Sequence, residues 1–282
     1  MALKIGVVVL TYNRAPALLG VLRSLATQCG EGHSVWIADD GSRADQVDLM
    51  RQGMPQFACP VHHVWHADVG FTAARARNLA AAQADADYLI FLDGDCVPNA
   101  EFIAQHILLA QSGTFVNGSR VLLSEKVTRR VEQNALDLLQ LSAVDWARMR
   151  LQGDCNKLSH LLHWPAAPGR ISSEFRWKGI RSCNFGVWSQ DFHAVNGFDE
   201  SFNGWGHEDA DLVLRLHHWG LQRKNGFWST EVYHLWHREF ARDQESTNRQ
   251  RVQARMQGTQ VKADVGLDQL ADRQSVLVTR IN

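Results

Sequence analysis

The residues best suited to chemistry stand together at positions 203–216, which read Asn-Gly-Trp-Gly-His-Glu-Asp-Ala-Asp-Leu-Val-Leu-Arg-Leu. The glycines let the backbone approach a ligand, and Trp205 offers a flat apolar face of the kind that packs on a sugar ring. Glu208, Asp209 and Asp211 place carboxylates at the start of a predicted helix. The segment therefore indicates a sugar-binding site with a candidate general base. The alternative is an ordinary helix N-terminus, where the dipole favours acidic residues and the leucines that follow pack behind them.

Two acidic turns are suited to binding a nucleotide and its metal ion. Asp93 and Asp95 directly follow the apolar run 88–92, and Asp40 lies in a second acidic turn at 39–42. Mg²⁺ and Mn²⁺ take carboxylate ligands and bridge them to phosphate oxygens, so one aspartate could hold the ion while its neighbour orients a ribose. Asp40 could bond a ribose or a base edge in the same way. Each stretch taken alone also fits a simple turn, because Asp and Gly favour turns.

A histidine pair and an arginine pair extend this set. His234 and His237 have an i, i+3 spacing, which we expect to bring both imidazoles near one face of a helical turn. Together with a carboxylate from elsewhere they would form a metal site. Arg75 and Arg77 open an alanine-rich stretch, where guanidinium groups suit phosphate and nucleotide oxygens, although a solvated surface explains them too.

The elements that must position these residues alternate along the first 125 positions. Continuous apolar strands alternating with helices predict an α/β fold with a doubly wound, mostly parallel sheet, in which ligands collect at the carboxyl ends of the strands. The polar residues at 11–14, 39–42 and 93–95 all follow such ends. We expect strands at 5–10, 34–38, 61–66, 88–92 and 114–121, and helices at 15–28, 45–52, 72–85 and 99–111.

The pattern changes in the second half of the chain. Residues 124–152 predict one long helix, and the loop-rich stretch that follows, up to 179, completes an insertion over the site. A strand at 182–189 and a helix beginning near Asp209 return the chain to the core. From 238 onwards we expect an exposed helix and a short apolar run at 275–281.

Composition narrows the class of protein. With 282 residues, 45% hydrophobic content and a formal net charge of -1, the chain can bury a large core and has no basic excess for nucleic acid. Its five cysteines are scattered without a CxxC pair, so we expect neither a disulfide framework nor a zinc–thiolate site, which fits a reducing cytoplasm. We see no cleavable signal and no apolar run near the ~20 residues of a spanning helix, so membrane association would be peripheral.

Several of these motifs resemble those of known glycosyltransferases. Residues 196–211 are similar to the carboxy-terminal module shared by the β-1,4-galactosyltransferase family and bacterial chondroitin-type polymerases. Four earlier motifs resemble the family-2 glycosyltransferases of the GT-A fold: Val-Val-Val-Leu-Thr-Tyr-Asn-Arg at 7–14, Ala-Asp-Asp-Gly-Ser at 38–42, Arg-Ala-Arg-Asn at 75–78 and Phe-Leu-Asp-Gly-Asp at 91–95.

The resemblance implies a domain organisation. A GT-A domain would span 1–240 and consist of a nucleotide-binding half (1–123), the insertion (124–180) and an acceptor and metal half (181–240). Residues 241–282 would be a helical C-terminal extension. We recognise no known motif in the insertion.

The resemblance also implies roles, residue by residue. Asp95 would bind Mn²⁺ or Mg²⁺ on the diphosphate with His237, and His234 stands where the galactosyltransferases have a methionine. Asp209 would be the catalytic base. Ala210 replaces an acid of the galactosyltransferase motif, which affects the expected acceptor contacts. The remaining expected contacts are to the donor nucleotide (Thr11, Tyr12, Asn13, Arg14, Asp40, Arg75, Arg77 and Asp93) and to donor and acceptor sugars (Trp205, Gly206 and Glu208).

The function implied is an inverting, metal-dependent transfer of a sugar from a UDP-sugar to a hydroxyl of a saccharide or glycolipid acceptor. We expect a cytoplasmic enzyme, at the inner face of the membrane if it binds there, acting in lipopolysaccharide, O-antigen or capsule synthesis. Two alternatives stay open at this stage. A nucleotide-sugar pyrophosphorylase would share the sheet and metal but would have a glycine-rich loop with a lysine, and a non-catalytic sugar-binding module would lack the nucleotide loops.

Overall fold

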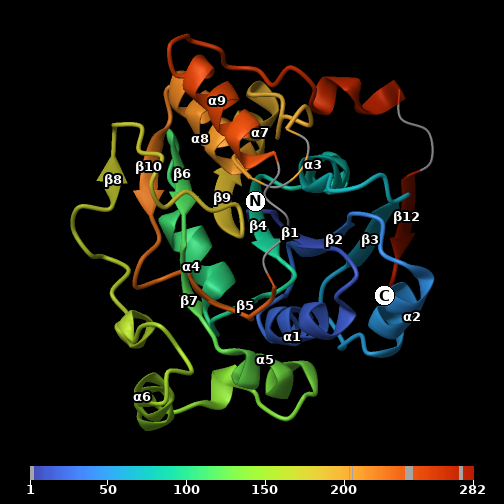
Figure 1. Ribbon diagram of the computed structural model, residues 1–282, viewed down its shortest axis with the longest axis vertical. Helices are drawn as coiled ribbons and strands as arrows, with labels where there is room; N and C mark the ends of the chain where they lie inside the picture. The colour runs from blue at the N-terminus through green and yellow to red at the C-terminus, as the bar shows by residue number, and fades with distance from the viewer. Residues whose placement is uncertain (1–2, 203, 205, 239–243, 273–275) are drawn as a thin grey trace.

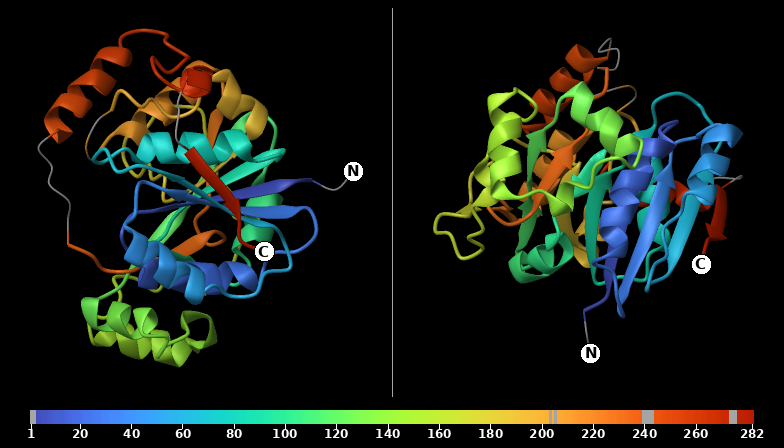
Figure 2. Two further views of the ribbon diagram at one scale, coloured as in Figure 1. Left: turned by 90° about the vertical axis from the view of Figure 1, so that its right-hand side faces the viewer. Right: turned by 90° about the horizontal axis from the view of Figure 1, so that it is seen from below.

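The computed structural model of the protein describes residues 3–282 except 203, 205, 239–243 and 273–275. Its larger sheet has nine strands among the described residues. Figure 1 shows the sheet near the centre of the molecule, and the left view of Figure 2 shows helices on both of its sides. In spatial order the strands are β12 (Val276–Arg280), β3 (Val61–His66), β2 (His33–Asp39), β1 (Ile5–Thr11), β4 (Tyr88–Asp93), β9 (Asn184–Trp188), β6 (Thr114–Asn117), β10 (Gln222–Asn225) and β8 (Ile171–Ser172).

The helices form the outer layers of the sandwich. The helices of the first 125 residues are α1 (Ala15–Ala26), α2 (Ala44–Gln52), α3 (Ala73–Gln83) and α4 (Phe102–Leu109). Later ones are α5 (Glu125–Glu132), α6 (Ala143–Leu151), α7 (Ser189–Ala194), α8 (Glu208–His218) and α9 (Glu245–Arg255), with 3₁₀ turns at Leu138–Gln140, Ser159–Leu161 and Leu267–Asp272.

The central strands are buried on both faces, which explains their unbroken apolar sequence. In β1, Val7 and Val9 join the core under α1 and α4, whereas Val8 joins the core under α3, α7 and α8. In β4, Ile90 and Phe91 divide between the two cores in the same way. Strands β3, β2, β1 and β4 are parallel neighbours, so the predicted doubly wound, mostly parallel sheet is confirmed.

The predicted strand 114–121 is wrong as a single strand. It divides at Gly118 into β6 of the large sheet and β7 (Ser119–Leu122) of a three-stranded sheet, which also contains β5 (Cys96–Pro98) and β11 (Glu231–His234). A Cβ on Gly118 would lie 2.1 Å from the side chain of Asn184, so only glycine lets the chain pass here. The break carries the chain away from the large sheet, and the prediction missed β5, β8, β10 and β11.

The predicted long helix at 124–152 is two helices, α5 and α6. Asn134 adopts a left-handed conformation (φ 55°) just after α5. Ser142 then starts α6 with a capping box, in which its hydroxyl accepts from the backbone N–H of Asp145 and the Asp145 carboxylate accepts from the backbone N–H of Ser142. The new N-terminus is therefore encoded locally. Figure 2 shows α5 and α6 as a lobe beside the sandwich.

The apolar run at the C-terminus is also more than an exposed tail. It forms β12, an edge strand antiparallel to β3, with Val276 opposite His66 and Arg280 opposite His62. Asn282 fixes the end of the chain, because its side-chain amide donates to the carbonyl of Cys59 and accepts from the N–H of Val61. Ahead of it, the expected helix is present as α9.

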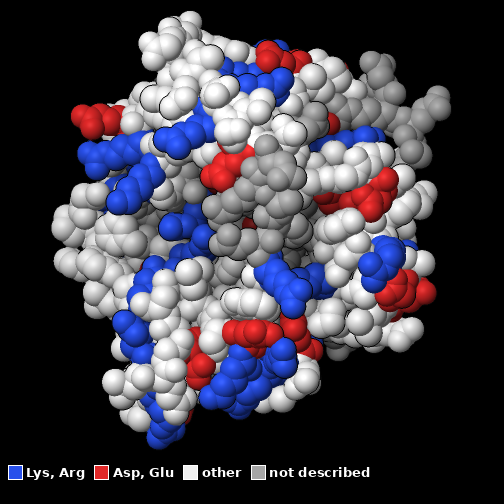
Figure 3. Space-filling model, viewed as in Figure 1, with Lys and Arg blue, Asp and Glu red and all other residues white. Residues whose placement is uncertain are grey.

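The helices and the surface charge each show one further feature. No helix in the described part of the chain is long and apolar enough to span a membrane. Although the net charge is only -1, Lys and Arg side chains gather on the face drawn in Figure 3, over β6 and β10 and in the hollow beside them.

Candidate functional site

A carboxylate and two imidazoles converge at one point of the molecule. Ligand atoms of Asp95, His234 and His237 all lie within 4.8 Å of one another. The Nε2 atoms of the two histidines lie 3.9 Å and 3.5 Å from the Asp95 carboxylate, respectively. The structure thus brings together the three residues that the sequence indicated as metal ligands.

Strand pairing explains how these distant residues meet. His234 ends β11 and lies opposite Cys96 of β5, so it stands beside Asp95. The N–H of Leu235 donates to the backbone carbonyl of Asp95 at 2.8 Å and holds the next turn of chain in place. The predicted helical turn is wrong, because His234 belongs to a strand and the residues up to His237 are not helical.

The chemistry of this cluster fits a divalent cation. Burial lowers the pKa of His234, and although Asp95 opposes this shift, Arg120 and His237 add to it. A neutral imidazole keeps a lone pair for a metal ion, and the carboxylate supplies negative charge. The oxygen and nitrogen donors would suit Mn²⁺.

Arg14 also reaches this cluster, although the resemblance groups it with the nucleotide contacts. Its guanidinium donates to Asp95 and to Glu132, both at 3.0 Å, and to the carbonyl of Trp236 at 2.6 Å. Its position places a fixed positive charge beside the candidate metal ligands.

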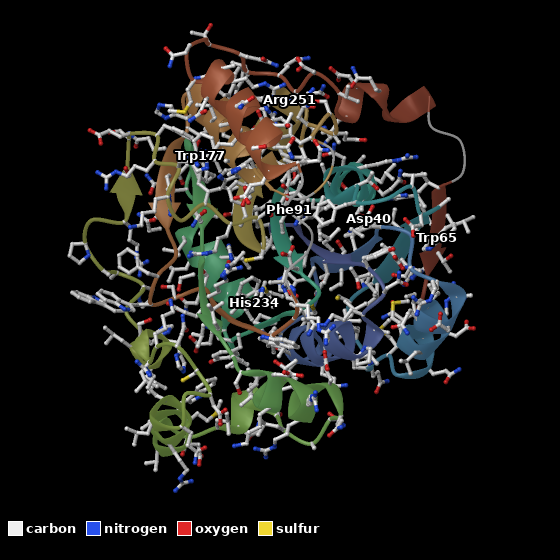
Figure 4. All side chains as sticks on the ribbon, viewed as in Figure 1. Asp40, Trp65, Phe91, Trp177, His234 and Arg251 are labelled. Carbon is white, nitrogen blue, oxygen red and sulfur yellow. The ribbon has the colours of Figure 1, made fainter. Side chains whose placement is uncertain are left out.

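The second acidic turn lies at the other end of the site. In Figure 4, Asp40 lies toward β2 and β3, whereas His234 lies toward β5. Asp40 is buried and accepts hydrogen bonds from the N–H (2.9 Å) and hydroxyl (2.5 Å) of Thr72, with His66 Nε2 at 3.2 Å. Asp39 is buried as well, against His63 at 2.8 Å. Both carboxylates shape the turn in addition to any role in binding.

The loop after β1 lies against this turn. Thr11 is buried, and the φ of Asn13 is 49°. The Asn13 side chain accepts from the backbone N–H of Arg43 at 2.8 Å. Tyr12 is 40% exposed and donates to Asp68 at 2.9 Å. The loop is therefore positioned by the turns after β2 and β3, with the Tyr12 ring open to solvent.

Arg77 joins the two halves of the site. Its buried guanidinium donates to Asp93 at 2.9 Å and to Glu208 at 3.4 Å. Burial lowers the pKa of Arg77, but the two carboxylates outweigh this effect and the net shift is upward. Arg75 is only partly buried, and its buried Nε has no hydrogen-bond partner among the described residues. Arg77 is thus a permanent bridge from the end of β4 to the start of α8.

The surroundings of Asp209, in the first turn of α8, disfavour the ionised form of its carboxylate. Burial is the largest cause and the charge of Glu208 the second, and together they raise the Asp209 pKa from 3.8 to about 7. The N–H groups of Ala210 and Ser182 and the charge of Arg77 act in the opposite direction. A carboxylate with a pKa near neutrality can accept a proton from a substrate and is a good candidate for general-base catalysis.

The remaining expected sugar contacts lie in the turn before α8. Trp205 lies outside the described residues. Gly206 has φ 106°, a conformation that favours glycine, and its carbonyl accepts from Asn248 of α9 at 3.0 Å. Glu208 is buried, and its carboxylate accepts from the Arg77 guanidinium at 3.4 Å. Gly206 and Glu208 are therefore held in place by α9 and by Arg77, respectively.

Sequence reasoning missed two arginines of the site. Arg120 on β7 lies near Asp93 and Cys183, and Arg181 lies near Asp209. Neither belongs to a recognised motif. The one signal in the sequence is that each arginine stands beside an apolar run. This signal becomes informative only when the strands formed by these runs are placed in the sheets.

Comparison with known proteins identifies the family of the chain. Residues 6–162 match the profile of glycosyl transferase family 2, and residues 169–238 match one described as the N-terminal domain of galactosyltransferase. Validoxylamine A glucosyltransferase of Streptomyces hygroscopicus subsp. jinggangensis (strain 5008) is 29% identical over 246 residues, which cover 77% of this chain and 52% of that protein. Chondroitin synthase of Escherichia coli is 23% identical over 274 residues, covering 87% and 36%. The chain spans about half the length of the first of these relatives.

Solved structures share the fold. S. aureus TarS 1-349 in complex with UDP has a TM-score of 0.57 at 14% identity, covering 94% of this chain and 68% of that chain. The mannosyltransferase PcManGT from Pyrobaculum calidifontis, in complex with GDP-Man and Mn²⁺, has a TM-score of 0.54 at 14% identity, covering 83% and 57%. Both resemblances inferred from the motifs are confirmed. Since the family match spans more than half of the chain, the protein belongs to glycosyl transferase family 2, and its fold is that of the GT-A structures.

Proposed function

We propose that the enzyme moves a sugar from a UDP-sugar to a hydroxyl of a saccharide acceptor and inverts the anomeric configuration. The observation that carries the proposal is the pairing of two chemistries in one site. A ligand cluster for a divalent cation lies at the ends of β4 and β11, and a carboxylate with a pKa of about 7 lies at the start of α8.

The donor nucleotide would run from Asp40 to Asp95. Each Asp40 oxygen already accepts one hydrogen bond from Thr72, but a carboxylate oxygen can accept two, so an N–H of uracil can still bind there. The ribose would contact Asp93, which Arg77 holds in place. The base is proposed to be uracil because TarS was solved with UDP and with UDP-GlcNAc, although PcManGT carries GDP-Man on the same fold. The other proposed donor contacts are Thr11, Tyr12, Asn13, Arg14 and Arg75.

Asp95, His234 and His237 would hold Mn²⁺ or Mg²⁺. When bound there, the ion supplies positive charge beside the leaving diphosphate. Arg14, 3.0 Å from Asp95, adds a fixed positive charge on the same side.

Asp209 would take the proton of the attacking hydroxyl. Arg77 lies close enough to lower the Asp209 pKa and also binds Glu208, so it fixes the first turn of α8 relative to β4. The backbone N–H of Ala210 donates to the Asp209 carboxylate at 2.7 Å and orients it. Attack from the side opposite the diphosphate is a single displacement, which inverts the configuration at the anomeric carbon.

We propose that the sugar acceptor belongs to a cell-surface polysaccharide pathway, namely that of lipopolysaccharide core, O-antigen or capsule. Chondroitin synthase of E. coli and hyaluronan synthase of Pasteurella multocida, which is 26% identical over 241 residues, support a polysaccharide product. We further propose that the enzyme is cytoplasmic and meets a glycolipid acceptor at the inner face of the membrane.

The test is release of UDP from a panel of UDP-sugars, with and without added saccharides, in Mn²⁺ and in chelator. We expect metal-dependent turnover with one or two donors and inverted products by NMR. A chain that binds sugars but releases UDP from none of the donors would be a binding module, and retained configuration in the product would rule out the single displacement.

A further inference from the structure

Four cations from distant parts of the sequence meet beside the proposed base. Arg120 is on β7, Lys157 follows α6, Arg181 precedes β9 and Arg223 is on β10. All four are partly buried, and we call them the cation cluster. On the face drawn in Figure 3, Lys and Arg side chains line part of the hollow near β6 and β10.

The cluster has no tight anionic partner. No described carboxylate lies within ion-pair distance of any of its members. Lys157 donates to the hydroxyl of Ser119 at 3.2 Å, and Arg223 donates to the carbonyls of Lys178 and Gly179, each at 3.2 Å. The Nε of Arg223 is buried and has no hydrogen-bond partner among the described residues. The cluster therefore has unused donor capacity.

Three of the members have a lowered pKa, whereas burial lowers the pKa of Arg120 but Cys183, Cys96 and Asp93 outweigh this effect. Burial and the charge of Arg120 lower the pKa of Arg181. Burial and the charge of Arg181 lower the pKa of Arg223. Burial lowers the pKa of Lys157 too, where Arg181 adds to the effect and Glu231 opposes it. A purely structural arrangement would pair such charges, since burying an uncompensated cation costs free energy.

The cluster borders the reaction centre. The charge of Asp209 acts on the pKa of Arg181, and the N–H of the next residue, Ser182, acts on the pKa of Asp209. On the other side, Arg120 lies near Asp93. A sugar whose hydroxyl reaches Asp209 would therefore lie beside these cations.

We propose that the cation cluster binds an acidic group, a carboxylate, phosphate or sulfate, on a saccharide acceptor whose hydroxyl faces Asp209. This inference rests on the proposed function and names its acceptor class. Guanidinium groups bind such oxyanions through paired, charge-assisted hydrogen bonds, and a bound anion would relieve the repulsion within the cluster. A neutral sugar would leave both the repulsion and the free Nε of Arg223 unsatisfied.

The test compares sugars that differ in one acidic group. The probes are p-nitrophenyl β-D-glucuronide against p-nitrophenyl β-D-glucoside, and glucose 6-phosphate against glucose, titrated by ligand-observed NMR with and without UDP at low and high salt. One acidic group on a guanidinium pair is expected to favour binding about tenfold. We expect that preference in the wild type, and we expect added salt to reduce it.

Arg223→Gln and Lys157→Gln should each reduce the preference to near unity. Lys224→Gln is the matched control, because Lys224 is the next residue of β10 and its amine bonds Gln111 at 3.1 Å instead. It should retain the preference. If Arg223→Gln does not fold by thermal melt, Lys157→Gln decides the outcome.

Three results would overturn the inference. They are equal binding of acidic and neutral probes by the wild type, an unchanged preference in the folded variants, and weakened UDP binding by the variants, which would assign the cations to the donor phosphates. Failure of the proposed function is separate, since it would appear as no UDP binding while the preference measured without UDP persists.

Discussion

Replacing Asp209 with asparagine should abolish turnover and at the same time stabilise the protein. Asn keeps the size and the helix-start position of the side chain but cannot accept a proton as a base. General-base catalysis contributes ~10²-fold or more, so we expect turnover to fall by at least that factor while UDP affinity changes little.

The stabilisation follows from the raised pKa. The Asp209 pKa rises from 3.8 to about 7 in the folded protein, mainly because of burial and then because of Glu208. Between these two values the folded state binds more protons than the unfolded state, so stability falls as pH rises and stays low above pH 7. One pKa unit corresponds to ~1.4 kcal/mol, and after allowing for coupling to Glu208 we expect a penalty of about 1–3 kcal/mol. Asp209→Asn removes it.

The assay is a thermal melt and a pH–rate profile on the same samples at pH 5 to 8.5. The wild type should gain turnover through an apparent pKa near 7, and the variant should melt several degrees higher than the wild type at pH 8 and by a clearly smaller margin at pH 5, where only part of the penalty has developed. Asp45→Asn is the control, because Asp45 is an exposed acid in the first turn of α2 whose pKa is lowered by its hydrogen bond to Arg43. It should give neither effect. Near-normal turnover of Asp209→Asn, or a lower melting temperature at pH 8, would refute the assignment.

Three other changes test the rest of the site. Asp95→Ala and His237→Ala should each remove metal-dependent UDP binding in calorimetry, and full activity of both variants in chelator would contradict a metal site. Asp40→Ala should raise the donor KM more than the acceptor KM, whereas unchanged UDP binding would leave Asp40 as a turn residue. Arg255→Met leaves buried Asp199 without its cation, which lies at 2.6 Å, so we expect a loss of about 3–5 kcal/mol in urea unfolding, and a loss below 1 kcal/mol would show that the pair is dispensable.

Much of the fold was predictable because its strands are buried on both faces. The run 61–66 coincides with β3, and 88–92 falls one residue short of β4. The errors arose where pairing partners are distant in sequence. The break at Gly118 depends on Asn184, and residues 276–280 of the C-terminal apolar run form a strand because β3 leaves an edge for them. Neither the contact with Asn184 nor the free edge of β3 can be read from the local periodicity of apolar residues.

The site was predictable to a similar degree. Its acidic turns follow strand ends, where a parallel sheet gathers ligands, and the His234 and His237 pair was identified by residue type although its helical geometry was wrong. The bridge made by Arg77 and the placement of Arg181 depend on how α3 and the chain before β9 pack. Such charges can be assigned only when the three-dimensional neighbours are known.

The start of α8 shows how a structural carboxylate differs from a functional one. Asp211 is fully buried, and two cations compensate it: Arg215 at 2.8 Å, and Arg255 from α9. Asp209, two residues earlier, has no cation in hydrogen-bond contact among the described residues, and its pKa rises to about 7. The helix dipole favours the ionised form of both carboxylates, and more so that of Asp209, so it cannot explain why only the Asp209 pKa is raised. The protein pairs the charge that it needs for stability and leaves unpaired the one that can take up a proton, which is why Asp209 is the residue we assign to chemistry.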